Sequence, residues 1–212
     1  MTEELTAEAF WAGEFGNAYS ARNESEEILR ANQRFFELSL LPARYIRATR
    51  VIEFGANVGM NLRALQLIPA FACATFTAVE INRLACARLR EHGIETHHAD
   101  FTEDQRSWGD GYDIVICKGV CIHVPEKRLR AAFAALYDAS NRFVFLAEYF
   151  AAQRREVTYR GNQDKLWLDD YGSRFWDQYP DLECVDTGFA WKRDKLAPQD
   201  NLVWHIFEKR LP

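Results

Sequence analysis

The 212-residue sequence has no long apolar run. Its longest stretch without a charged residue, between Arg63 and Glu80, is interrupted by Pro69 and by polar side chains such as Gln66. Because one bilayer-spanning helix needs about 20 predominantly apolar residues, we expect no membrane segment. The opening residues MTEELTAEAFW lack a basic patch followed by an apolar stretch, so we also expect no secretory signal.

The sequence also lacks an excess of positive charge. It contains 26 Lys and Arg against 31 Asp and Glu, which gives a net charge of −5. A protein that binds phosphate backbones usually carries a basic surface, so we expect no nucleic acid among its partners.

No cysteine motif for zinc or redox chemistry is present. The five cysteines form no CxxC pair and make an odd total, which fits reduced thiols in a cytoplasmic protein. We interpret Cys117 and Cys121 as small buried residues on a core strand, because a catalytic role would require a partnering base. Adjacent His97 and His98 would face opposite sides of a strand, so no metal site is predicted.

The composition fits an ordinary globular protein, with 48% hydrophobic, 14% aromatic and 27% charged residues. We find no internal repeat and no low-complexity linker, and we expect residues 1–212 to form a single domain.

Strand-like and helix-like segments alternate along most of the chain, which predicts an α/β fold with a mostly parallel sheet. A capping-box pattern at Asn23 and Glu26 predicts a helix over 24–41 within an N-terminal helical cap, 1–45. Expected strands cover 50–54, 74–80, 93–98, 112–119 and 142–150, and expected helices cover 59–68, 82–93 and a segment opened by Pro125.

The C-terminal third departs from this alternation. Residues 183–195 and 201–209 look like two strands of a hairpin, with no helix between them. Residues 150–182 form a candidate substrate-covering insertion in a region rich in aromatic side chains. These aromatics could equally anchor a long connection onto the sheet.

The first predicted strand runs into the turn Glu53-Phe-Gly55-Ala-Asn57-Val-Gly59. Glycine lets backbone approach a ligand closely, and asparagine is the residue that best replaces it in a left-handed conformation. Glu80 follows the second strand, where a carboxylate can accept hydrogen bonds from both ribose hydroxyls. These features predict a nucleoside site at the carboxyl ends of the strands.

Two nucleoside cofactors suit this geometry, and the charges distinguish them. The pyrophosphate of a nicotinamide dinucleotide would be repelled by Glu53, and the spacing GxNxG differs from GxGxxG. Glu53, Glu80 and Asp100 would instead attract the positively charged S-adenosylmethionine. Asp100 could accept from the adenine amino group while Phe101 or Ile81 packs on the ring, although Asp100 could also cap a helix.

With these features, the chain resembles a class I S-adenosylmethionine-dependent methyltransferase, and more narrowly the pseudaminic acid biosynthesis-associated methylases. In this fold class a Rossmann-like, seven-stranded sheet is mostly parallel and ends in an antiparallel C-terminal hairpin. The segments that carry the resemblance are FWAGEFGNAYSARN at 10–23, EFGANVGMN at 53–61, KGVCIHV at 118–124, AEYF at 147–150, YRG at 159–161 and GFAWKRDKLAPQDNLVW at 188–204.

The resemblance implies methyl transfer to a nine-carbon acidic sugar, its nucleotide-activated form or a precursor, in bacterial surface or flagellar glycosylation. S-adenosylhomocysteine would be the product. It also implies cofactor or substrate-mouth roles for a group of residues near the turn and in the N-terminal segment. These residues are Trp11, Tyr19, Arg22, Asn23 and Asn61. Alternatively, Trp11 and Tyr19 could pack the first helix onto the sheet, and Arg22 and Asn23 could cap it.

For catalysis, methyl transfer needs positioning and a group that takes the acceptor's proton. His123 follows the fourth strand at the same edge and is our first candidate for the base, although it could also cap the next helix. Glu148 and Tyr149 end the fifth strand, and alternation predicts that only one reaches the pocket. Lys118 could orient the cofactor through its backbone, or its side chain could pair with a carboxylate.

Four residues in the family-like segments are candidates for binding an acidic sugar, although a solvated charged loop would explain them too. They are Tyr159, Arg160, Lys195 and Asp200. Other functions stay open at this point: a non-catalytic module that binds the nucleoside, a protein or RNA methyltransferase, and an NAD-dependent oxidoreductase.

Overall fold

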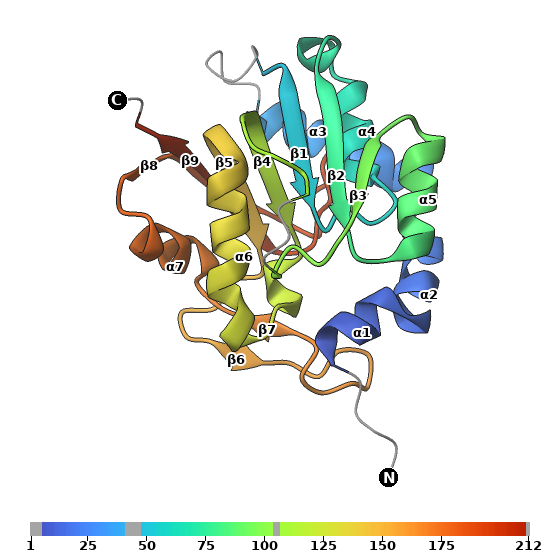
Figure 1. The fold of residues 1–212 in the computed structure, drawn as a ribbon, viewed down its shortest axis with the longest axis vertical. Helices are drawn as coiled ribbons and strands as arrows, with labels where there is room; N and C mark the ends of the chain where they lie inside the picture. Colours follow the sequence, from blue (N-terminus) through green and yellow to red (C-terminus); the bar gives the residue numbers. More distant parts are fainter. Residues whose placement is uncertain (1–5, 41–47, 104–106, 211–212) are drawn as a thin grey trace.

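The computed structural model describes residues 6–40, 48–103 and 107–210. Within these residues seven strands form one sheet in the order β3-β2-β1-β4-β5-β9-β8 (Figure 1). Neighbours from β3 to β5 are parallel, and β9 pairs antiparallel with both β5 and β8. The strands are β1 (Arg50–Phe54), β2 (Thr75–Glu80), β3 (Glu95–His98), β4 (Tyr112–Lys118), β5 (Ser140–Glu148), β8 (Leu182–Ala190) and β9 (Leu202–Lys209). This confirms the predicted α/β fold with a reversed C-terminal hairpin.

Helices cover both faces of the sheet. Successive residues of a strand point to opposite faces, so Ile114 and Ile116 of β4 join the apolar core under α3, α4 and α5, whereas Val115 joins the core under α6 and α7. The helices are α3 (Glu26–Leu40), α4 (Met60–Gln66), α5 (Arg83–Glu91), α6 (Glu126–Ala139) and α7 (Tyr171–Gln178), with short 3₁₀ turns η1 (Pro69–Phe71) and η2 (Cys121–His123).

Several predicted boundaries were wrong, each for a local reason. Ser25 rather than Asn23 caps α3, because its hydroxyl accepts from the N–H of Ile28 whereas Asn23 ends the preceding helix. The first hairpin strand ends at Ala190, well before residue 195, so the loop before β9 is longer than predicted. The end of the predicted helix over 24–41 and of the cap over 1–45 lies outside the described residues.

Two peripheral segments lie at the end of the sheet to which the parallel strands point (Figure 1). One is the N-terminal pair α1 (Ala7–Ala12) and α2 (Glu14–Arg22). The other contains the short hairpin β6 (Arg155–Glu156) and β7 (Trp167–Leu168). The candidate insertion over 150–182 therefore contains this hairpin and α7.

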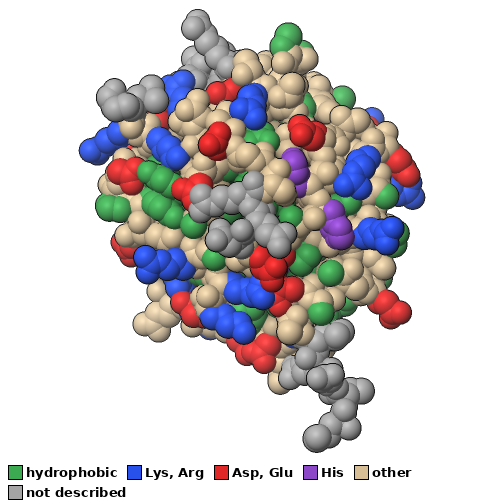
Figure 2. Space-filling model, viewed as in Figure 1, with side chains coloured by type: hydrophobic (Ala, Val, Ile, Leu, Met, Phe, Trp, Pro, Cys, Tyr) green, Lys and Arg blue, Asp and Glu red, His purple; other side chains and the backbone are tan. Residues whose placement is uncertain are grey.

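Acidic and basic side chains are interspersed over the face shown in Figure 2. Among the described residues, no helix has both the length and the apolar character needed to cross a membrane.

Candidate active site

A cavity of about 720 Å³ opens at the carboxyl ends of the parallel strands. This volume is in the range of sites that enclose small-molecule ligands. Its walls come from α1 and α2, the turn after β1, the ends of β2 and β4, the 159–166 segment and the loop before β9. Of the sequence-predicted residues, the cavity is lined by Trp11, Tyr19, Asn23, Gly55, Asn57, Asn61, Glu80, Ile81, Asp100, Phe101, Lys118, His123, Tyr149, Tyr159, Arg160 and Asp200.

The turn after β1 has the backbone conformation expected from its sequence. Gly55, Asn57 and Gly59 all have positive φ, at 69°, 49° and 79°. A Cβ at Gly55 would lie 2.6 Å from the side chain of Val120, so the turn has no room for a larger residue there. Asn57 adopts the left-handed conformation predicted for it, and its Oδ1 accepts from the Ser20 hydroxyl at 2.5 Å. Gly59 is the N-cap residue that precedes α4, and it does not line the cavity.

Glu80 ends β2 at the cavity, and two backbone amides hold its carboxylate. Asn57 N–H donates to Oε2 and Asn82 N–H donates to Oε1, each at 2.7 Å. Burial raises the pKa of Glu80, while these hydrogen bonds oppose that shift. The two oxygens keep unused lone pairs, so the carboxylate is oriented to accept from a pair of ligand hydroxyls.

Asn82 connects this carboxylate to the N-terminal helices. Its side-chain Nδ2 donates to Asn17 Oδ1 at 2.8 Å and to the Trp11 carbonyl at 3.1 Å. Its Oδ1 caps α5 by accepting from Leu84 and Ala85. The Asn82 and Ser20 contacts place α1 and α2 over the cavity. Sequence reasoning missed both residues, and only the N-cap position of Asn82 before α5 carries a recognisable signal.

Asp100 lies beyond the end of β3 and is held by several partners. Its carboxylate accepts from Thr102 and from the Arg128 guanidinium at 2.9 Å. Arg128 also pairs with Glu8 of α1 at 2.9 Å. Phe101 is buried with its ring centroid 5.3 Å from that of Phe54. Asp100 therefore lines the cavity and caps a turn, not the helix that the alternative interpretation expected, because no helix directly follows it in the described residues.

Glu53 lies beneath the cavity, not on its wall. It is fully buried, and its Oε1 accepts from Asn61 Nδ2 at 2.6 Å. Burial raises the pKa of Glu53 to about 8, while the hydrogen bond from Asn61 and the nearby Lys118 oppose that shift. Because burial disfavours its charged form, Glu53 attracts a cation less strongly than the sequence suggested, and the carboxylates on the cavity wall itself include those of Glu80 and Asp100.

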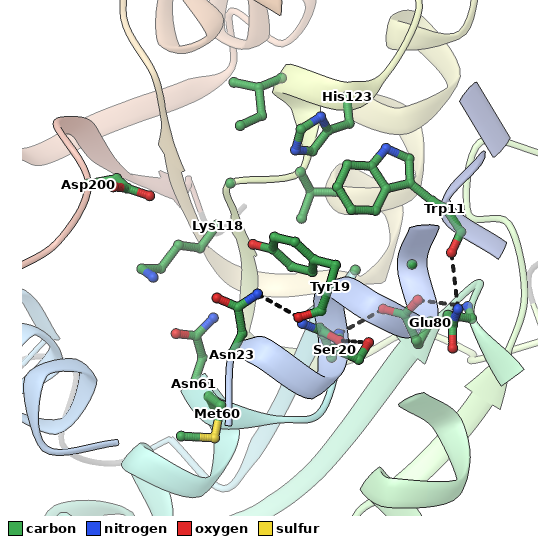
Figure 3. A pocket seen from close by; sticks show the side chains of 18 of the residues that line it. Trp11, Tyr19, Ser20, Asn23, Met60, Asn61, Glu80, Lys118, His123 and Asp200 are labelled. Atoms are coloured by element: carbon green, nitrogen blue, oxygen red, sulfur yellow. Dashed lines mark hydrogen bonds between the residues drawn. The ribbon is translucent and has the colours of Figure 1, made fainter. Parts of the chain in front are cut away.

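His123 ends η2 and lines the cavity beside aromatic rings. Figure 3 shows the imidazole next to the Trp11 ring, and the two ring centroids lie 4.3 Å apart. The centroid of the Tyr159 ring lies 5.3 Å from that of His123. Its Nδ1 lies 2.7 Å from the carbonyl oxygen of Lys165. A carbonyl only accepts, so Nδ1 carries the proton and Nε2 keeps its lone pair. Burial lowers the pKa of His123 to about 4, which corrects the expectation that this imidazole titrates near neutral pH.

Only Tyr149 of the predicted pair on β5 reaches the cavity. Glu148 is fully buried behind η2, where its carboxylate accepts from the N–H groups of Val120, Cys121 and Ile122. This carboxylate therefore holds the turn that carries His123, and we do not retain it as a catalytic candidate. Tyr149 donates to Asp200 at 2.6 Å, and burial together with this bond raises the pKa of Tyr149.

Cys117 and Cys121 lie close to Glu148, with their sulfur atoms 3.6 Å apart. The hydrogen bond with Cys121 and burial raise the pKa of Cys117 well above its usual value, so its thiol is protonated at neutral pH. Cys117 is on a core strand as predicted, whereas Cys121 begins η2.

Some of the predicted sugar-binding residues line the cavity and others do not. Tyr159 and Arg160 lie at a tight turn over the cavity, where Arg160 has a left-handed φ of 48°. A left-handed conformation at a non-glycine residue costs energy and often marks a functional position. Lys195 and Arg22 are exposed and lie outside the cavity wall. Sequence reasoning missed the Asn32–Gln199 pair, whose buried side-chain amides join at 3.0 Å and fix the loop before β9 to α3.

No family model matches the sequence, and no curated protein matches it in a sequence search. Solved structures of the same fold are numerous. Magnesium protoporphyrin IX methyltransferase from Synechocystis PCC 6803 with bound SAM is 13% identical, with a TM-score of 0.67, over 99% of this chain and 100% of that one. A SAM-dependent methyltransferase from Leishmania major is 16% identical, with a TM-score of 0.66, over 95% and 81%.

A third similar structure is 1,6-didemethyltoxoflavin-N1-methyltransferase from Burkholderia thailandensis, bound to 1,6-didemethyltoxoflavin and S-adenosylhomocysteine. It is 12% identical, with a TM-score of 0.66, over 99% of this chain and 93% of that one. At these identities the likeness concerns the fold: the chain has the Rossmann-like fold of SAM-dependent methyltransferases.

Proposed function

We propose that the protein is an S-adenosylmethionine-dependent methyltransferase that acts on a small acidic sugar. The observation that carries the cofactor part is the placement of Glu80. Its carboxylate ends β2 beside a left-handed turn and is held by two backbone amides at the edge of a ligand-sized cavity. A carboxylate fixed in this position at a strand end suits the paired hydroxyls of a ribose.

The residues around Glu80 also fit the rest of the cofactor. Ile81, Asp100 and Phe101 offer apolar surface and a carboxylate for an adenine ring. The backbone at Gly119 is open, because a Cβ there would meet no protein atom within 4 Å. These groups suit a nucleoside that carries positive charge.

Bound S-adenosylmethionine would supply an activated methyl group. The chain's own part is to orient the acceptor, exclude water and accept a proton. His123 suits proton acceptance because Lys165 fixes its tautomer and leaves Nε2 unprotonated. Trp11 and Tyr159 pack around the imidazole and shield it from water.

The substrate part is supported by the polar character of the other cavity wall and by the family-like segments. Asn23, Asn61 and Asp200 offer amide and carboxylate groups that suit sugar hydroxyls. Arg160 and Lys118 offer positive charge for an acidic group. The substrate we propose is pseudaminic acid or a related nonulosonic acid, free or nucleotide-activated.

Calorimetry with S-adenosylmethionine and S-adenosylhomocysteine tests the cofactor part, and we expect saturable binding of both. Incubation with acidic sugars and their CMP forms, followed by mass spectrometry, tests the substrate part through the gain of one methylene unit. Cofactor binding without product from any sugar would favour a non-catalytic module or another acceptor. Absence of cofactor binding would contradict the whole proposal.

A further inference from the structure

Lys118 is the last residue of β4, and its side chain extends into the cavity. Figure 3 shows Lys118 and Asp200 to one side of the Tyr19 ring, and Glu80 and Trp11 to the other. The ammonium group therefore lies away from the carboxylate that we assign to the ribose.

This ammonium has no close counter-ion. Among the described residues, no carboxylate oxygen lies within 4.0 Å of Lys118 Nζ. The centroid of the Phe35 ring lies 5.8 Å from this nitrogen. Burial lowers the pKa of Lys118, while the more distant Glu53 and Asp200 oppose that shift. An unpaired ammonium in a partly dry cavity is costly, and an anionic ligand would remove that cost.

Polar groups that suit a sugar surround this ammonium. Asn61, Asn23 and Lys118 all line the cavity, and in the view of Figure 3 they are drawn to the same side of the Tyr19 ring. Because Asn61 Nδ2 donates to Glu53, its buried Oδ1 is left without a protein donor. Asn23 Nδ2 donates to the Tyr19 carbonyl, which orients the second amide. Each amide oxygen can accept from a ligand hydroxyl.

The other basic side chains on the cavity wall are placed differently. Lys192 is 72% exposed and lies 3.9 Å from Asp200, and Arg160 is exposed at the tip of its turn. Among the Lys and Arg residues in the described part of the wall, Lys118 is thus the one that is half-buried and not exposed. A partly desolvated ammonium discriminates charge more strongly than a fully solvated one.

We propose that the ammonium of Lys118 binds the carboxylate of the acceptor, while the amide oxygens of Asn61 and Asn23 accept from hydroxyl groups of the same molecule. This inference rests on the proposed function and makes Lys118 the residue that selects acidic over neutral acceptors. The methionine end of the cofactor also carries a carboxylate, so the experiment must separate the two sources.

The probes are pseudaminic acid and its carboxyl methyl ester, titrated into protein saturated with S-adenosylhomocysteine. We expect the wild type to bind the acid about 10- to 100-fold more tightly than the ester, as for a charge-assisted hydrogen bond. Lys118→Met should lose this preference and bind the acid about as weakly as the ester. Lys127→Met, an exposed control on α6 away from the cavity wall, should keep it, and both variants should bind S-adenosylhomocysteine within about threefold of wild type.

Three results would overturn the inference. The first is an acid preference retained in Lys118→Met. The second is a tenfold or greater loss of S-adenosylhomocysteine affinity in Lys118→Met with the sugar preference intact, which would assign the ammonium to the cofactor's carboxylate. The third is equal affinity of the wild type for the acid and the ester. This result would overturn the inference even if the Lys118→Met variant did not fold. Wild-type protein that does not bind S-adenosylhomocysteine would instead contradict the proposed function.

Discussion

The main-chain N–H of Asn57 donates a 2.7 Å hydrogen bond to the carboxylate of Glu80. This contact makes the turn after β1 and the end of β2 one unit, because the left-handed conformation of Asn57 aims its N–H at the neighbouring strand. Asn82 holds the second carboxylate oxygen and also contacts the Trp11 carbonyl. A change at Glu80 should therefore affect both ligand binding and the placement of the N-terminal helices.

Replacing Glu80 with alanine should weaken S-adenosylmethionine binding about 100-fold or more. The variant removes two charge-assisted acceptors, each worth roughly 1.5–3 kcal/mol, and leaves the N–H groups of Asn57 and Asn82 without their partner. Calorimetry measures the affinity. Glu91→Ala is the control, because Glu91 is an exposed residue of α5, and this variant should bind S-adenosylmethionine as the wild type does. Unchanged affinity in Glu80→Ala would contradict the ribose assignment.

Substitutions at Asn57 should lower the free energy of unfolding by amounts that depend on how well each residue tolerates a φ of 49°. Asn57→Val should cost most, at about 2 kcal/mol, because β-branched residues avoid this region. Asn57→Gly should cost least, since glycine adopts the conformation freely and only the bond from Ser20 is lost. Urea unfolding with constant m-values checks the order. Ser20→Ala isolates the side-chain bond, and a valine variant as stable as the glycine variant would contradict the argument.

Local sequence signals were sufficient for the succession of strands and helices along the chain and for the turn after β1, and insufficient for the walls of the cavity. The apolar run of β4 and the left-handed Asn57 follow from period and residue type, so both were predictable. Glu148 ends β5 as expected, but its partners are backbone amides of a turn that is distant in sequence. The Asn32–Gln199 contact joins residues 167 positions apart, and no local pattern contains that information.

His123→Ala should lower turnover by about 100-fold or more while cofactor affinity changes little, because a positioned base contributes mainly to the chemical step. The free enzyme should show no inflection of kcat/KM from this imidazole near pH 6.5, since burial lowers its pKa to about 4. Steady-state rates from pH 5 to 8 measure this. An inflection near pH 6.5 that disappears in the variant would contradict the assigned charge state.

The same depressed pKa of His123 predicts how stability depends on pH. Between about pH 6.5 and 4, His123 is protonated in the unfolded chain but stays neutral in the folded protein. The free energy of unfolding therefore falls as the pH is lowered through this window. Between pH 7 and pH 5, the free energy of unfolding of His123→Ala should therefore fall by about 1–2 kcal/mol less than that of the wild type. Urea unfolding at the two values gives the difference, and parallel losses in both proteins would contradict it.

Asp169 should be the residue that fixes the 150–170 segment over the cavity. Its buried carboxylate pairs with Arg154 at 3.3 Å and with Arg174 at 2.6 Å, and Arg154 also donates to the Val124 carbonyl next to His123. Asp169→Ala leaves both guanidinium groups with only the more exposed Glu126 carboxylate as an acidic partner, so it should cost about 2 kcal/mol, whereas the exposed Glu26→Ala should cost less than about 0.5 kcal/mol.

Because the Lys165 carbonyl that orients His123 belongs to this segment, Asp169→Ala should also lower turnover. Hydrogen exchange should rise in residues 150–170 of the variant and stay unchanged in the sheet. If exchange rose there while turnover was normal, the segment would not be what orients the imidazole. If neither changed, the ion pairs with Arg154 and Arg174 would not be what holds the segment in place.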